Sequence, residues 1–152
     1  MTSTRAKGGA YQRKIKKWIE DNYPGSYVHN QVSSSSVFIN KEGKAQYRSP
    51  KGNDILGCID IVAIIPHKLP VFIQCTMHTG VEKRLKDMIK VPWNIMYASV
   101  QLWQDKGGGR TVIKELDQWF AGDNKLVVSE LVNKAEIIRG KQIGEIFDDC
   151  RE

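Results

Sequence analysis

The sequence predicts an α/β fold, and two kinds of apolar pattern support this prediction. Two runs rich in Ile and Val, residues 54–65 and 71–76, flank a stretch that begins with Pro66 and ends with Pro70, which is typical of a β-hairpin. Apolar residues at helical spacing predict an N-terminal helix and another over residues 81–91. Because both hairpin runs are apolar on both faces, we expect this strand pair to be covered on both sides.

Polar residues interrupt the apolar hairpin at its open end. If the turn is centred on Lys68, Val62 lies opposite Gln74 and Asp60 lies opposite Thr76. Because side chains alternate between the two faces of a strand, Asp60, Gln74 and Thr76 then share one face. This polar trio is the first candidate for a functional site.

The N-terminal helix is predicted from an apolar stripe formed by Tyr11, Ile15, Trp18 and Ile19. The Gly8-Gly9 pair before it either lets the backbone approach a phosphate or forms a flexible lead-in. All charged residues before the first acidic residue of this helix are basic, namely Arg5, Lys7, Arg13, Lys14, Lys16 and Lys17. A basic face of this kind either binds phosphates or is simply solvated.

The remaining elements are shorter predictions. A strand is expected over residues 27–32, a serine-rich loop over 33–36, a second hairpin from 37–40 and 45–48, strands over 94–104 and 110–114, and a helix-like segment over 134–138. At 152 residues the chain fits one domain. We expect a core over about residues 5–120 and a C-terminal extension over 121–152 that covers the sheet or completes a dimer.

Composition restricts the classes of function. The formal net charge of +6 favours a polyanionic partner, although a basic protein without nucleic-acid binding stays open. The sequence has no apolar run long enough to span a membrane and no apolar signal-peptide core. Cys58, Cys75 and Cys150 lack metal-site spacing and are expected to be reduced. These features predict an intracellular, cytoplasmic protein.

Two segments together resemble a known family. Asp60 begins one strand, Gln74-Cys75-Thr76 ends the next, and residues 5–14 form a basic, glycine-containing entry to a helix. This order resembles the PD-(D/E)XK nuclease superfamily, in the branch of archaeal and phage Holliday junction resolvase-like proteins and virus-type replication-repair nucleases. The resemblance covers roughly the first two thirds of the chain. It implies a restriction-endonuclease-like mixed sheet of four to five strands flanked by helices.

The resemblance also implies roles for individual residues. Asp60 matches the metal-binding Asp of the family, Gln74 stands in place of the metal-binding Glu, and Thr76 stands in place of the catalytic Lys. Gln12 falls where resolvases usually have a helix Glu. With no Lys at position 76, the positive group is expected from Lys83, Arg84 or Lys86, or from Lys51.

The expected cofactor is Mg²⁺, with Mn²⁺ as an alternative, because this chemistry needs a hard cation with oxygen ligands. Asp60, the amide of Gln74 and the backbone carbonyl of Cys75 are the expected ligands. Asp54 is either a second carboxylate ligand or the cap of a turn. Residues expected to bind nucleic acid are Lys7, Arg13, Lys14, Lys17, Arg48, Lys51, Lys83 and Arg84.

The resemblance thus implies a Mg²⁺-dependent DNA endonuclease of the Holliday junction resolvase-like type. It is expected to act on DNA, including branched DNA, as a homodimer, because two cuts need two centres. The alternative is a protein of the same fold that binds DNA or serves in an assembly without cutting, which the amides and hydroxyl at Gln12, Gln74 and Thr76 favour. A basic structural protein with no nucleic-acid role is a third possibility.

Overall fold

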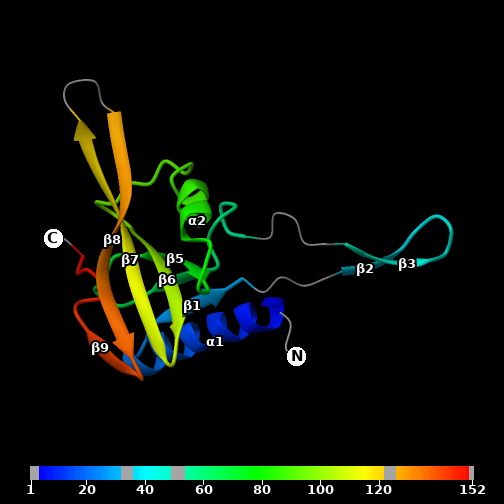
Figure 1. Cartoon of the computed structure of the whole chain (residues 1–152), viewed down its shortest axis with the longest axis horizontal. Coiled ribbons are helices and arrows are strands. Elements are labelled where there is room, and N and C mark those ends of the chain that lie inside the picture. Colours follow the sequence, from blue (N-terminus) through cyan, green and yellow to red (C-terminus); the bar gives the residue numbers. More distant parts are fainter. Residues whose placement is uncertain (1–3, 32–35, 49–53, 122–125, 151–152) are drawn as a thin grey trace.

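The computed structural model describes residues 4–31, 36–48, 54–121 and 126–150 (Figure 1). The elements in chain order are α1 (Thr4–Asn22), β1 (Tyr27–Asn30), β2 (Ser36–Ile39), β3 (Ala45–Arg48), β4 (Ile61–Ile64), β5 (Val71–Thr76), α2 (Val81–Met88), β6 (Ser99–Gly107), β7 (Arg110–Ala121), β8 (Leu126–Ile138) and β9 (Lys141–Ile143). The fold is α/β, with a mixed seven-stranded sheet in the order β1-β4-β5-β6-β7-β8-β9. Only β5 and β6 pair in parallel among these neighbours.

The sheet is wider than the four to five strands expected, because the C-terminal third of the chain continues it. β7 runs well beyond the predicted residues 110–114, and β8 pairs with it along almost its whole length. The prediction of a helix-like segment over 134–138 is wrong. Ala135 and Ile137 alternate into the apolar core as β8 pairs with β7, and this burial outweighs the weak helical preference of the local sequence.

The helix α1 packs its predicted apolar stripe against the sheet. Tyr11, Ile15 and Ile19 are buried, and α1 lies along β1 and β5. The helix begins earlier than expected, at Thr4, so Gly8 and Gly9 lie inside it and do not form a flexible lead-in.

The predicted central hairpin is confirmed, but its register differs by two residues. Val62 lies opposite Phe72, so the turn is centred on His67, which adopts a left-handed φ of 64°. Lys68 is drawn away from the turn centre because it forms a bridge with Asp149 in the C-terminal segment. A shift of two residues keeps every side chain on its predicted face.

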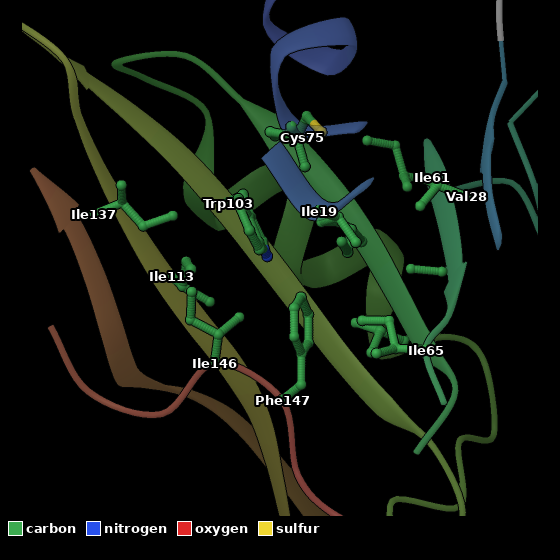
Figure 2. Close-up of a cluster of buried hydrophobic side chains, with 14 of the residues drawn as sticks. Ile19, Val28, Ile61, Ile65, Cys75, Trp103, Ile113, Ile137, Ile146 and Phe147 are labelled. Carbon is green, nitrogen blue, oxygen red and sulfur yellow. The ribbon is translucent and has the colours of Figure 1, made fainter. Parts of the chain in front are cut away.

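Two apolar clusters cover the two faces of the sheet. The larger lies under α1 and includes Ile19, Ile73, Trp103 and Phe147, and Figure 2 shows Ile19, Trp103 and Phe147 among its side chains. The smaller lies under α2 and includes residues such as Leu102. Alternate residues of β4 and β5 therefore face different cores, as the apolar pattern of this hairpin predicted.

Two further boundaries differ from prediction. The helix α2 ends at Met88, three residues before the predicted end at 91, and β6 begins at Ser99 after a loop that occupies the start of the predicted strand 94–104. Among the described residues no helix is both long and apolar enough to cross a membrane.

The second predicted hairpin, β2–β3, is confirmed and lies apart from the main sheet (Figure 1). Its turn is closed by Asn40, whose Oδ1 accepts hydrogen bonds from the backbone N–H groups of Glu42 and Lys44. A side chain that satisfies turn N–H groups in this way favours the turn locally.

Candidate functional site

Four separate segments of the chain line one pocket of about 360 Å³. The first segment is one turn of α1, the second is the residue before β4, the third is the end of β5 with the residues that follow it, and the fourth is α2. The lining residues are Gly8, Gln12, Asp60, Cys75, Thr76, Met77, Thr79 and Arg84. The fold brings together five sequence-predicted site residues that span nearly half of the chain, namely Gln12, Asp60, Cys75, Thr76 and Arg84.

Asp60 is the only carboxylate among the lining residues of this pocket. Its side chain is buried, with 7% of the residue exposed. Asp60 Oδ2 accepts hydrogen bonds from Gln74 Nε2 at 2.8 Å and from the backbone N–H of Cys75 at 2.9 Å. The two-residue change of register places Asp60 beside Gln74, where Thr76 had been expected.

Burial raises the pKa of the Asp60 carboxyl from its usual 3.8 to about 6. The hydrogen bond from Cys75 N–H lowers this pKa, as does the positive charge of Arg84, while the negative charge of Asp54 raises it. At neutral pH the carboxylate is still ionised, but it carries a desolvation cost. A cation or a further hydrogen-bond donor beside Asp60 would relieve this cost.

The amide of Gln74 lies between two oxygen atoms. Gln74 Nε2 donates to Asp60 Oδ2 and also to the backbone carbonyl of Cys75 at 3.0 Å. Gln74 Oε1 is buried and has no hydrogen-bond partner among the described residues. The amide nitrogen thus satisfies the two oxygens that the sequence proposed as metal ligands.

Thr76, Gln12 and Arg84 form the rest of the pocket wall. Thr76 is buried, and its hydroxyl donates to the backbone carbonyl of Thr79 at 3.0 Å, so it closes the loop after β5. Gln12 is half-buried on α1. Arg84 is exposed and lines the pocket, whereas Lys83 and Lys86, the other candidates on α2 for the positive group, do not line it.

Other predicted residues lie outside the pocket. Asp54 is exposed, and its backbone carbonyl accepts a turn hydrogen bond from Gly57 N–H; it influences Asp60 only through its charge. Lys7, Arg13, Lys14 and Lys17 are exposed on α1, and Lys17 pairs with Asp21 at 3.3 Å. Lys51 and the side chain of Arg48 lie outside the described residues.

Gln104 was not expected to belong to the site. It lies opposite Thr76 on the neighbouring strand β6 and is 3% exposed. Its Nε2 donates to the backbone carbonyl of His78 at 3.2 Å, and its Oε1 has no partner within the described part of the chain. Gln104 does not line the pocket, and β6 carries other buried polar residues such as Gln101, so no signal in the sequence singles it out.

The residues fit a hard cation with few protein ligands. No group of three or more His, Cys, Asp or Glu side chains in the described ranges is arranged to hold a metal ion. Mg²⁺, however, usually takes only one or two carboxylates and keeps several waters. Rotation of the Gln74 amide would turn its unpartnered Oε1 towards Asp60 Oδ2 and the Cys75 carbonyl, which gives one charged and two neutral oxygens.

Comparison of the chain with protein-family models, with curated proteins and with solved structures finds no match.

Proposed function

We propose that this chain is a metal-dependent DNA endonuclease of the Holliday junction resolvase-like type, with a restriction-endonuclease-like core. The observation that carries the proposal is the convergence of four segments on one pocket, which brings together Gln12, Asp60, Thr76 and Arg84. The family resemblance assigns catalytic positions to three of these residues. Order in the sequence and proximity in space thus support the same site.

The chain's own residues have distinct roles in this proposal. Asp60, the Gln74 amide oxygen and the Cys75 carbonyl would hold Mg²⁺ or Mn²⁺. Such an ion, when bound, lowers the pKa of water and stabilises charge on the phosphate. Asp60 has to be deprotonated, and its pKa of about 6 allows this at neutral pH.

Arg84 and Gln12 would contact the substrate. The guanidinium of Arg84 supplies the positive charge that the family takes from Lys, and it forms paired hydrogen bonds with phosphate oxygens. The amide of Gln12 would donate a hydrogen bond to a phosphate oxygen from the opposite wall. The net charge of +6 supports a DNA partner, and cleavage of both strands of a branched substrate would require a homodimer.

The test is cleavage of plasmid, single-stranded and four-way-junction DNA with Mg²⁺ or Mn²⁺. We expect Asp60→Ala to reduce cleavage by more than about a hundredfold, since loss of groups that merely orient metal ligands already costs about 10–100-fold. Asp117→Ala removes an exposed carboxylate on β7 and should leave cleavage unchanged. Metal-dependent cleavage that survives Asp60→Ala would overturn the proposed site.

A second function is favoured by the position of the Gln74 amide. Gln74 Nε2 donates to Asp60 Oδ2 and to the Cys75 carbonyl, so these two oxygens have a hydrogen-bond donor without a cation. A protein of this kind would bind DNA and not cut it. Salt-sensitive DNA binding by the parent protein, without cleavage under any metal condition, would establish this alternative.

A further inference from the structure

A second hollow, of about 510 Å³, lies over β7, β8 and β9. Its charged lining consists of four cations and one acid, namely Lys106, Arg110, Lys114, Lys134 and Glu136. It is larger than the pocket at Asp60, and the family resemblance assigns no role to it. A hollow with this excess of cations is suited to an anionic ligand.

Two of the four cations are already paired with acids. Arg110 pairs with Glu136, and Lys134 pairs with Glu115 at 2.6 Å and with Asp148 at 2.8 Å.

Lys106 and Lys114 take part in no ion pair among the described residues. Lys106 is exposed and Lys114 is half-buried. The hollow therefore has two positive charges that no acid in the described chain neutralises.

The register of the sheet places Val112 and Lys114 in the wall of this hollow on the same face as Gln74 and Thr76. Thr76 lies opposite Gln104, which lies opposite Val112 in the wall of the hollow. One step along, Gln74 lies opposite Leu102, which lies opposite Lys114. Residues directly opposite one another project from the same face.

The distance between the two sites is short. Neighbouring strands are about 4.8 Å apart, so three strand spacings separate β4, which Asp60 directly precedes, from β7 by roughly 14 Å. A nucleic-acid strand advances about 3.4 Å per nucleotide along a duplex axis. This separation therefore corresponds to about four nucleotides, and one strand can contact both sites.

We propose that Lys106 and Lys114 bind the phosphate backbone of the DNA strand next to the bond positioned at Asp60. This inference rests on the proposed function, because it assigns a path to the substrate of that site. Two ammonium groups act as point charges on phosphates and read no base sequence. The part of the sheet that carries Lys106 on β6 and Lys114 on β7 thus contributes affinity for DNA, while the pocket at Asp60 contributes the chemistry of cleavage.

The experiment measures binding separately from cleavage. A fluorescently labelled four-way junction and a matched duplex are titrated with Asp60→Asn protein in the presence of a chelator, at several salt concentrations. The test protein also carries Lys106→Gln and Lys114→Gln. The control protein carries Lys68→Gln and Lys90→Gln, which remove the same charge at the far end of the β4–β5 hairpin and after α2.

Compared with the Asp60→Asn protein, we expect the test protein to bind both DNAs about tenfold more weakly per lost phosphate contact at 0.1 M salt. The slope of log affinity against log salt concentration should become shallower by about two. The control should change affinity much less. Equal affinity of the two proteins for DNA would overturn the path across Lys106 and Lys114 and leave the proposed function standing. Absence of DNA binding by the Asp60→Asn protein itself would overturn both.

Discussion

The two faces of β5 differ in how completely the buried side-chain atoms on them find suitable partners. Towards α1, Ile73 and Cys75 lie in the larger apolar core. The other face carries Gln74 and Thr76, and next to them Gln104; both amide oxygens there are buried without partners in the described chain. An unsatisfied buried polar atom costs about 1–3 kcal/mol. The apolar face thus stabilises a strand whose opposite face is arranged at the expense of stability.

The largest expected effect is on the apolar face. Ile73→Ala removes a side chain that is 0% exposed in the larger core. We expect a loss of about 2–5 kcal/mol in the free energy of unfolding, because transfer and cavity costs add. Urea denaturation followed by tryptophan fluorescence measures it.

Ile64→Ala is the matched control, because Ile64 on the adjacent strand β4 is 48% exposed. Its loss should be well under that of Ile73→Ala. Similar losses for the two variants would mean that the α1 face does not carry the stability assigned to it.

A smaller effect on the free energy of unfolding is expected from the ionisation of Asp60 on the polar face, in the absence of metal. Because burial raises the pKa of Asp60 from 3.8 to about 6, the folded state binds more protons than the unfolded state between about pH 4 and 6. The stability of the parent relative to Asp60→Asn should therefore fall by about 3 kcal/mol as the pH rises through this window. Above it the difference should stay constant.

Denaturation in a chelator from pH 3.5 to 7.5 gives this difference for the two proteins. The exposed Asp117 provides the comparison, because Asp117→Asn removes the same carboxylate at a position outside the pocket. A difference between parent and Asp60→Asn that does not change between pH 4 and 6 would show that Asp60 is not desolvated in solution.

The sequence predicted the parts of the fold that depend on local pattern. Alternation identified the β4–β5 and β2–β3 hairpins, and helical spacing identified α1 and α2. The register of the β4–β5 hairpin was missed because residues 67–69 pair with the C-terminal segment. There the backbone N–H of Leu69 donates to the backbone carbonyl of Asp148, and the backbone N–H of Cys150 donates to the backbone carbonyl of His67. The helix-like segment at 134–138 was misjudged because only pairing with β7 fixes it as a strand. Both contacts link residues far apart in the sequence.

The candidate site, too, was predicted where local sequence pattern decides and missed where packing between distant segments decides. Strand alternation was sufficient to place Asp60 and Gln74 on one face, and they are in contact. It did not distinguish Arg84 from its neighbours on α2, because the orientation of that helix on the sheet decides which cation lines the pocket. It also did not reveal that the Gln74 amide bridges Asp60 and the Cys75 carbonyl, because a side-chain rotamer has no signal in the sequence.

The smallest expected effect sharpens the role of Gln74. Gln74→Glu adds a carboxylate beside Asp60, so in a chelator the two buried charges repel and the protein is less stable. If the pocket binds Mg²⁺ as proposed, we expect the second carboxylate to be a ligand, and each tenfold gain in affinity to add about 1.4 kcal/mol of stabilisation at saturating metal. Thermal unfolding with and without Mg²⁺ measures the gain, and Gln142→Glu on β9, which is exposed, adds the same charge away from the pocket. Equal Mg²⁺ stabilisation of the two variants would mean that the unpartnered oxygen of Gln74 does not mark a cation site.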